Sequence, residues 1–256
     1  MIRVRVVRAR GSTPREEGAE MFVGRDAASG TIGGGHLEYM AIDRARQMLE
    51  RGEATASMDV ALGPEIGQCC GGRVELAFDR ARPAPAEPGP PVLIFGAGHV
   101  GRALAVALAP LPLSPRLIDT RAAELSLAPA HVATTLSALP EVEIRAAPPG
   151  AAYVILTHDH ALDFMLAVEA LKRGDAGYVG MIGSRTKKAT FLNHAAREGI
   201  DAGALVCPIA AESPRDKRPE VIAAFAAAEL LSCLLARPAT PVEAIAAPTP
   251  SVFLVD

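Results

Sequence analysis

The first third of the chain carries hydrophobic patterns of two different periods. Apolar and basic side chains alternate over residues 3–6, and a second alternation runs over residues 74–78. This period of two predicts half-buried strands. Between them the period is helical, and Gly52 can end the helix. The apolar stripe of that helix consists of Leu37, Met40, Ala41, Ala45, Met48 and Leu49. We therefore expect a small mixed α/β domain here.

The rest of the chain alternates short apolar runs with longer helical patterns. Strands are expected at residues 92–95, 116–118, 153–156 and 178–182, and helices are expected to begin near Val100, Ala161, Thr186 and Arg218. Strands that alternate with helices form a parallel sheet with helices on both faces. The pattern therefore predicts a second, Rossmann-type α/β domain with a parallel sheet.

A proline-rich segment separates the two patterns. Its prolines are Pro83, Pro85, Pro88, Pro90 and Pro91. They remove backbone donors and prevent a regular helix, so the segment is expected to act as a semi-rigid spacer. We accordingly expect an N-terminal domain at residues 1–80, a linker at residues 81–91 and the Rossmann-like domain at residues 92–256.

Composition and charge argue against several classes of function. The 256 residues are 50% hydrophobic and 21% charged, with a formal net charge of −3. This balance gives no electrostatic reason to expect a nucleic-acid partner. The sequence has no apolar run of about 18 residues of the kind that crosses a membrane, and its start lacks the apolar core of a secretory signal. We expect a cytoplasmic protein that contacts neither nucleic acid nor membrane.

The loop after the first strand of the Rossmann-type domain has the spacing of a phosphate-binding turn. Gly96 permits a tight turn, Gly98 lets a phosphate approach the backbone, and Gly101 lets the next helix pack closely. The start of that helix offers free N–H groups to an anion. Asp119 ends the next strand, where a ribose-binding acid is expected. The alternative is a scaffold that binds no dinucleotide, with His99 as a loop residue without a chemical role.

Thr157 and His158 follow the third strand of this domain. In doubly wound folds that edge of the sheet faces the ligand crevice. His158 and His160 with nearby acids suggest a metal site, but the two histidines are only two residues apart. Asp159 or Asp163 is suited to cap the next helix, a common role for Asp. We favour ligand lining and capping over metal binding.

Ser184 and Arg185 follow the fourth strand of the domain. Ser184 or Thr186 can cap the next helix. Arg185, Lys187 and Lys188 cluster near the start of that helix, where cations oppose the helix dipole. A bound phosphate would offset this electrostatic cost, and a solvated basic face is the alternative.

Gln68, Cys69 and Cys70 lie in a segment flanked by glycines. Thiolates are soft ligands for soft metal centres and can carry sulfur, whereas the alternative is two small buried residues in a turn. The spacing of the four cysteines matches no zinc-finger pattern. Cys233 lies in an apolar run, and we expect it in the core.

Motifs spread over nearly the whole chain together resemble the XdhC/CoxI family of molybdoenzyme maturation proteins. The matching stretches are residues 11–15, 18–21, 30–38, 68–72, 96–101, 156–163, 180–185, 207–209 and 216–222. The glycine loop is generic, but the set is specific. The double cysteine and residues 216–219 are most similar to the XdhC branch. One position departs from the family pattern, because Ala210 stands where we expect glycine.

The resemblance implies a molybdenum cofactor-binding chaperone. Such proteins bind the molybdopterin form of the cofactor, protect it, support its sulfuration with a cysteine desulfurase, and deliver it to apo-xanthine dehydrogenase or a related molybdoenzyme. The chain would then carry the cofactor rather than use it as a classical enzyme does, and a homo-oligomer is compatible with this role. The implied cofactor-binding residues are Gln68, Cys69, Cys70, Gly96, Gly98, His99, Gly101, Asp119, Thr157, His158, Ser184 and Arg185, with Cys69 and Cys70 at the metal.

Two other functions are also compatible with the residues. An NAD(P)-dependent oxidoreductase would use the glycine loop at residues 96–101 together with Asp119. A redox or metal-binding module would use Cys69 and Cys70 alone. The spectrum of the purified protein separates these functions, because a pterin chromophore with molybdenum favours carriage and a bound nicotinamide favours the oxidoreductase.

Overall fold

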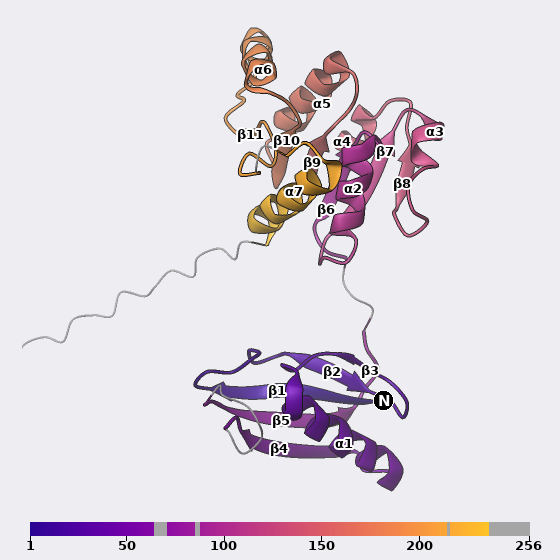
Figure 1. Cartoon of the computed structure of the whole chain (residues 1–256), viewed down its shortest axis with the longest axis vertical. Coiled ribbons are helices and arrows are strands. Elements are labelled where there is room, and N and C mark those ends of the chain that lie inside the picture. The colour runs from indigo at the N-terminus through magenta and orange to yellow at the C-terminus, as the bar shows by residue number, and fades with distance from the viewer. Residues whose placement is uncertain (64–70, 85–87, 214–215, 236–256) are drawn as a thin grey trace, which may run out of the picture. The chain divides into compact units, whose positions relative to one another are not determined.

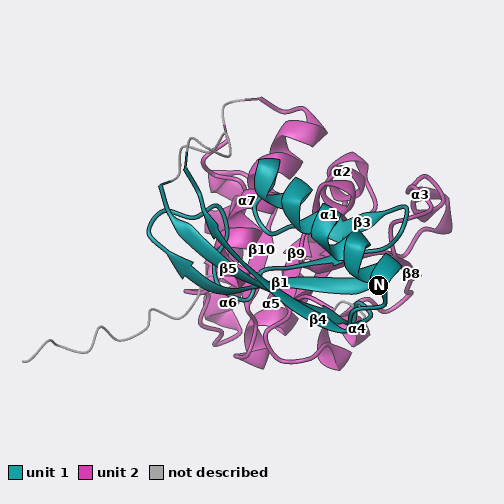
Figure 2. Ribbon diagram, turned by 90° about the horizontal axis from the view of Figure 1, so that it is seen from below, with its two compact units in different colours: residues 1–86 teal, residues 87–256 magenta. Residues whose placement is uncertain are grey.

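A computed structural model describes residues 1–63, 71–84, 88–213 and 216–235. The chain divides into two compact units, Met1–Ala86 and Glu87–Asp256 (Figure 2), and each is described by itself. Gln68, Cys69 and Cys70 lie outside the described residues. None of the described helices is both long enough and apolar enough to cross a membrane.

The first unit is a five-stranded antiparallel sheet with one long helix against it (Figure 1). Its elements are β1 (Ile2–Arg10), β2 (Glu20–Val23), β3 (Ala28–Gly30), α1 (Gly35–Arg51), β4 (Thr55–Ala61) and β5 (Arg73–Arg80), and the strand order is β3-β2-β1-β5-β4. Helix α1 buries Leu37, Ala41, Ala45 and Met48 of the predicted stripe. It ends at Gly52 in the left-handed conformation, as expected for a helix-terminating glycine.

The second unit has a six-stranded parallel sheet in the order β11-β10-β9-β6-β7-β8. Its strands are β6 (Pro91–Phe95), β7 (Ser114–Asp119), β8 (Thr134–Leu136), β9 (Ala152–Ile155), β10 (Tyr178–Met181) and β11 (Leu205–Val206). Read from β8, the sequence order is 3-2-1-4-5-6, which is the doubly wound Rossmann order. The direction of winding reverses between β6 and β9. The predicted fold class is therefore confirmed.

Helices cover both faces of the parallel sheet, as the pattern predicted. Its helices are α2 (His99–Leu108), α3 (Ala122–Leu125), α4 (Glu141–Ala146), α5 (His160–Arg173), α6 (Arg185–Arg197) and α7 (Pro219–Leu234). Helices α2 and α7 lie side by side over one face (Figure 1), and α5 and α6 cover the other. Every residue of β9 is buried, which explains its continuous apolar run.

The prediction that Cys233 lies in the core is wrong, because its side chain is exposed. Helix α7 buries Ala223, Ala226 and Leu230, and Leu234 packs partly against the same core. Cys233 lies beside this stripe. The helix is apolar around most of its circumference, so the sequence pattern did not distinguish its buried side from its exposed side.

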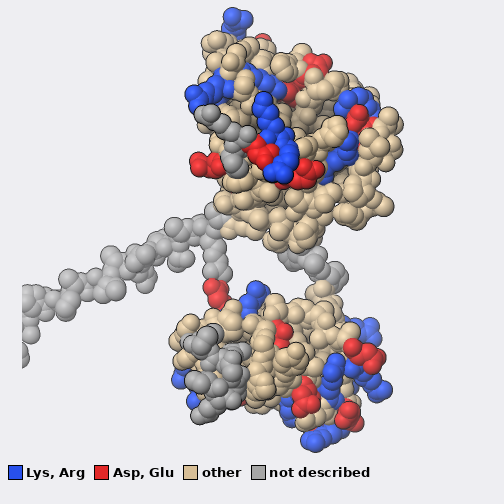
Figure 3. All heavy atoms as spheres, viewed as in Figure 1, with Lys and Arg blue, Asp and Glu red and all other residues tan. Residues whose placement is uncertain are grey.

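Charges on the second unit are interspersed. On the face seen in Figure 3, acidic and basic side chains lie close to one another, without a wide field of a single sign. Ion pairs within this unit include Arg145 with Glu169 and Arg173 with Asp175. Charges mixed in this way give this face no electrostatic field of one sign that would attract a strongly charged ligand over a distance.

Candidate functional site

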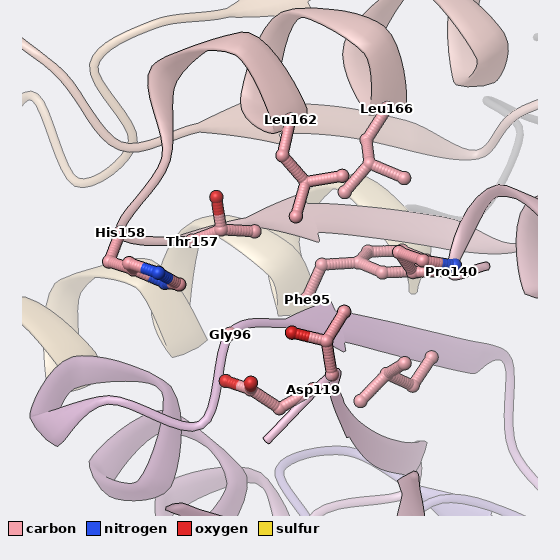
Figure 4. Close-up of a pocket in the computed structure, with 10 residues that line it drawn as sticks. Phe95, Gly96, Asp119, Pro140, Thr157, His158, Leu162 and Leu166 are labelled. Carbon is pink, nitrogen blue, oxygen red and sulfur yellow. The ribbon is translucent and has the colours of Figure 1, made fainter. Parts of the chain in front are cut away.

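The point where the winding of the parallel sheet reverses carries a small pocket (Figure 4). Phe95 and Gly96 of the β6 end, Asp119 of the β7 end, and Thr157 and His158 of the β9 end all line it. The cavity has a volume of about 10 Å³, close to the minimum that holds one water molecule. In doubly wound folds this crevice outside the carboxyl ends of the strands receives the ligand. The cavity itself is too small for a ring system.

The glycine loop has the geometry that its sequence predicted. Gly96 has a φ of 114°, and a Cβ on it would lie 2.4 Å from the carbonyl oxygen of Leu156. A Cβ on Gly101 would lie 1.9 Å from the carbonyl oxygen of Gly96, so only glycine lets α2 pack this close to the loop. A Cβ on Gly98 would meet nothing within 4 Å. The space above Gly98 is therefore open to an approaching group.

Helix α2 begins at the open side of this loop. Its N-cap residue is Gly98, which has no side chain to accept hydrogen bonds from the first turn. The free N–H groups of a first turn favour an anion. His99 is exposed and lines a separate hollow between α2 and α7, together with Arg102 and Glu220.

Asp119 is buried, and the chain itself fills its acceptor positions. Its Oδ2 accepts from the Ala97 N–H at 2.7 Å and from Arg121 Nη2 at 2.9 Å, and its Oδ1 accepts from the Arg121 N–H and Nε, both at 2.9 Å. A carboxylate has about four such positions. Burial raises the pKa of Asp119, but the hydrogen bonds from Arg121 and Ala97 outweigh it and hold the pKa below its usual value. Asp119 has no acceptor position left for a ribose hydroxyl.

A chain of charges holds the loop from both sides. The carbonyl oxygen of Ala97 accepts from Arg102 Nη1, which also lies 2.8 Å from Glu124 Oε2. Glu124 Oε1 in turn lies 3.9 Å from Arg121 Nη1. The peptide of Ala97 is thus bound at its N–H by Asp119 and at its C=O by Arg102. We name Asp119, Arg121, Glu124, Arg102 and Ala97 the loop clamp.

Thr157 and its neighbours form a compact turn after β9. Thr157 donates from its backbone N–H to Asp163 Oδ1 at 3.0 Å, and its Oγ1 lies 2.6 Å from the same oxygen. Asp159 caps α5 by accepting from the N–H groups of Ala161 and Leu162, so the capping interpretation holds for Asp159. His158 is exposed at the mouth of the pocket.

Asp163 also joins this turn to the next loop of the sheet. It is fully buried, and its Oδ2 pairs with Nζ of Lys187, whose side chain is 10% exposed. Ser184 caps α6 by accepting from the Lys187 N–H at 3.2 Å. Arg185 is exposed at the first position of that helix. One of the three clustered cations therefore has a structural partner, which the sequence did not indicate.

Backbone hydrogen bonds join the residues that flank the double-cysteine segment, Leu62 before it and Gly71 and Gly72 after it. The Leu62 N–H donates to the Gly72 carbonyl, and the Gly71 N–H donates to the Leu62 carbonyl, both at 2.8 Å. A Cβ on Gly72 would lie 2.2 Å from the Ser12 carbonyl oxygen. The segment thus connects β4 to β5, and its C-terminal anchor packs against the loop that follows β1.

The conformation of the loop after β11 shows why glycine is expected at the position of Ala210. Ala210 has a φ of 55°, the only positive φ of a non-glycine residue within the described ranges. Its N–H donates to Glu229 Oε2 at 3.0 Å, and Glu229 also pairs with the Tyr178 hydroxyl. A left-handed residue favours glycine, in agreement with the family pattern.

Cys207 lies close to this loop. Burial raises the pKa of its thiol, so this residue is a poor thiolate donor.

The structure therefore brings together some of the predicted residues. Gly96, Asp119, Thr157 and His158 line one pocket, and Ser184 and Arg185 follow the neighbouring β10. Gly98 and Gly101 continue the loop beside this pocket, whereas His99 lines the separate hollow between α2 and α7. In the part of the chain that the structure describes, no group of three or more His, Cys, Asp or Glu side chains could hold a metal ion. Motif reasoning did not predict that Asp163 pairs with Lys187, although it considered both residues for other roles. It missed Arg102 and Arg121 altogether, because neither belongs to a motif.

Comparison with known proteins covers both units. A family model described as the XdhC Rossmann domain matches residues 92–230, and one described as the XdhC and CoxI family matches residues 1–59. The uncharacterized protein YqeB of Escherichia coli (strain K12) is 28% identical over 206 residues, which cover 76% of this chain and 36% of that protein. The chain thus spans about a third of the length of this relative.

A solved structure has a similar fold. A protein of Bacillus halodurans described as a xanthine dehydrogenase superposes with a TM-score of 0.77, and the superposition covers 94% of each chain. Its sequence identity is 16%. The likeness extends to both units of the chain and concerns the fold.

Proposed function

The chain belongs to the XdhC and CoxI family, and from this we propose that it is a molybdenum cofactor-binding chaperone in xanthine dehydrogenase maturation. In this role it protects the cofactor, supports its sulfuration by a cysteine desulfurase, and delivers it to the apo-enzyme. The observation that carries the proposal is the match of both family models, in order, along one chain.

The residues at the β6 end fit the phosphate of a molybdopterin. The space above Gly98 is open, and the first turn of α2 has no side-chain cap. These features suit a phosphate oxygen approaching the backbone. The crevice below, with a volume of about 10 Å³, does not admit the pterin ring. We therefore assign only the phosphate end of the cofactor to this loop, with Thr157 and His158 beside it.

Arg185 is the second candidate for the phosphate. It is exposed at the start of α6, where Ser184 supplies the cap and Lys187 is engaged by Asp163. A guanidinium forms charge-assisted hydrogen bonds with a phosphate, and these are stronger than neutral ones. Lys187 and Asp163 connect the first turn of α6, which carries Arg185, to Thr157. This connection supports a common ligand at the ends of β9 and β10.

Cys69 and Cys70 are the proposed soft ligands. When bound, the cofactor supplies a molybdenum centre whose oxo ligand is exchanged for a sulfido ligand. A thiolate is a soft donor suited to such a centre, and Gln68 precedes the pair. Cys207 is less suited to this role, because burial raises its pKa.

The loop clamp argues against the NAD(P)-dependent alternative. In dinucleotide-binding domains the acid at the end of the second strand accepts hydrogen bonds from the ribose. The matching Asp119 already accepts four hydrogen bonds from Arg121 and Ala97. The Rossmann order alone indicates a fold and leaves the ligand undetermined.

The test is the cofactor content of protein purified from a molybdenum-replete host. We expect molybdenum and pterin in equal amounts in the native chain, and activation of apo-xanthine dehydrogenase. Cys69→Ser and Cys70→Ser should fold normally but retain less molybdenum or activate less, because a hydroxyl is a harder ligand than a thiolate. Cys233→Ser, an exposed change in α7, is the matched control. The proposal is wrong if the native protein holds no pterin, and the role of the thiols is wrong if the double serine variant matches the native chain.

A further inference from the structure

The sheet of the first unit has one face that α1 leaves open. Five charged residues line a hollow of about 100 Å³ on it: Arg8, Arg10, Asp59, Arg73 and Glu75. They come from three neighbouring strands, β1, β5 and β4. A water needs only about 10–15 Å³ of such space, so the hollow has room for a group much larger than one water. We name it the arginine hollow.

A break in the alternation of β1 creates this hollow. Ile2, Val4 and Val6 are buried, so a regular strand would turn Arg8 and Arg10 toward the core as well. The pairing of β1 with β5 shifts register between Val6 and Arg8, which marks a bulge. Bulges re-aim side chains and are frequent near functional sites. Beyond it, Ala9 packs against the core, and both arginines are exposed.

The register beyond the bulge places two arginines opposite each other. Arg10 and Arg73 are Cα partners across β1 and β5, and Arg8 is the partner of Glu75. Side chains that face each other in this way lie about 5 Å apart at their Cβ atoms, and like charges there destabilise the sheet. A sheet that only needed to fold would gain from a neutral residue at either position.

The acids of the hollow neutralise the arginines only in part. Asp59 receives two hydrogen bonds from Arg73, at 2.7 Å from Nε and 2.9 Å from Nη2. Within the described residues, neither the Arg8 nor the Arg10 guanidinium forms a hydrogen bond or a close ion pair, although the charge of Arg10 helps Arg73 to lower the pKa of Asp59. Glu75 is the remaining acid of the hollow. Three cations therefore face two carboxylates. The Arg8 and Arg10 guanidinium groups are left for a ligand.

We propose that the arginine hollow binds a tetrahedral oxyanion of phosphate size. Arg8 and Arg10 donate to it, and Arg73, held in place by Asp59, supplies a third positive charge. Guanidinium groups suit oxyanions because they donate two parallel hydrogen bonds. The oxyanion also offsets the repulsion between Arg10 and Arg73. Its source is either a free inorganic anion or the phosphate of a monoester.

The position of the hollow relates it to the double-cysteine segment. Arg73 directly follows Gly72, which forms the anchor of that segment with Leu62. Gly72 also packs against the carbonyl oxygen of Arg10, to which a Cβ on Gly72 would come within 2.8 Å. Two of the arginines that would bind an anion in the hollow, Arg10 and Arg73, therefore lie beside the Gly72 anchor at the C-terminal end of the segment. This site is additional to the one proposed at Gly98.

The test is a thermal-unfolding titration of the full chain with inorganic phosphate, sulfate, molybdate and glycerol phosphate. Potassium chloride at matched ionic strength corrects for screening. We expect phosphate to raise Tm of the native chain, and Arg10→Gln to weaken the apparent affinity at least ten-fold. Without added anion, Arg10→Gln should unfold no earlier than the native chain, because it removes the repulsion from Arg73.

Two controls make the result specific. Arg5→Gln alters an exposed arginine of the same strand outside the hollow, and it should respond to phosphate as the native chain does. Gly98→Val blocks the proposed site of the second unit and should also keep the response, so the two proposals fail separately. A response to glycerol phosphate equal to that of phosphate indicates a monoester ligand, and a response to inorganic anions alone indicates a free ion. The proposal is overturned if phosphate acts no more strongly than chloride, or if Arg10→Gln responds like Arg5→Gln.

Discussion

At the scale of single residues, the glycine loop depends on the peptide of Ala97. Asp119 binds its N–H, and Arg102 binds its carbonyl oxygen. Buried hydrogen bonds to charged groups contribute more than neutral ones, about 1.5–3 kcal/mol each. One of the groups that hold the loop, Asp119, is the acid that binds the ribose in dinucleotide-binding domains. A side chain at Gly96 or Gly101 would collide with the backbone, whereas one at Gly98 would not. Substitutions at these positions can test this difference.

Gly98→Val should fold and lose cofactor. Gly98 has an extended conformation with a φ of −66°, which valine can adopt, and a Cβ there meets nothing within 4 Å. The added methyl groups occupy the space that a phosphate needs. We expect molybdenum per folded protein to fall at least ten-fold, measured by metal analysis after gel filtration. Gly96→Val is the contrasting variant and should fail to fold correctly, because its Cβ would collide with Leu156. Full cofactor content in folded Gly98→Val would show that this loop is not the phosphate site.

Ala210→Gly should stabilise the chain. Ala210 holds a left-handed conformation that costs an L-residue about 1–2 kcal/mol. Glycine removes this cost but adds freedom to the unfolded chain and loses a buried methyl group, so we expect a net gain of about 0.5–1 kcal/mol in the free energy of unfolding. Urea unfolding measures it. Ala226→Gly, inside α7, should instead lose about 1 kcal/mol or more. Equal losses in both variants would contradict this explanation of Ala210.

At the scale of elements, the start of α6 carries two cations with different roles. Lys187 is paired with the buried Asp163, whereas Arg185 is exposed. Asp163 also binds Thr157, so α6 and the turn after β9 share one buried carboxylate. Removing a partner of a buried pair leaves an uncompensated charge. Removing an exposed cation from a helix N-terminus relieves an unfavourable interaction with the dipole.

We therefore expect opposite effects from Arg185→Ala and Lys187→Ala. Arg185→Ala should leave stability unchanged or raise it by about 0.3–1 kcal/mol, while weakening cofactor retention and its sensitivity to salt. Lys187→Ala should lower the free energy of unfolding by about 3–5 kcal/mol. Urea unfolding and the molybdenum content at two salt concentrations measure these effects. If Arg185→Ala retains the cofactor as the native chain does at both salt concentrations, Arg185 belongs to the solvated surface.

Sequence patterns predicted the long helices and the central strands of both sheets, and missed most of the shorter elements. The helices α1, α2, α5, α6 and α7 and the strands β1, β5, β6, β7, β9 and β10 were all expected near their observed positions. Strands β2, β3, β8 and β11 and helices α3 and α4 have two to six residues, too few for a period to appear. Strand β4 has seven residues and was also missed, because it buries only one of them and its side chains are mostly polar or small. The glycine loop followed from spacing alone. The loop clamp did not, because its contacts join residues that are 22 positions apart in the chain.

At the scale of the whole molecule, each unit has a core of its own. The core of the first unit is formed by β1, β2, β4, β5 and α1, and that of the second lies on both faces of the parallel sheet. The proline-rich segment joins them. We propose that residues 1–80 and 92–256 are separate domains, because each buries a complete set of apolar side chains and contacts cluster within each unit.

The two domains should fold when expressed apart. Residues 1–84 and 88–256 should each give a cooperative urea transition, and their circular dichroism spectra should add to that of the full chain. A separate first domain should keep the response of the arginine hollow to phosphate. An unfolded first domain in isolation would show that it needs the rest of the chain for stability.

The close contact between Gly101 and Gly96 has a consequence for how a ligand arrives. Helix α2 touches the loop backbone so closely that a single methyl group would separate them, and the clamp fixes the peptide between. Strand β6, the loop and α2 must therefore move as one rigid body. A rigid loop loses little conformational freedom when a ligand binds, so the entropic cost of ordering the protein is small. Association at this loop should accordingly follow a single concentration-dependent rate, without a slower phase from rearrangement of the backbone.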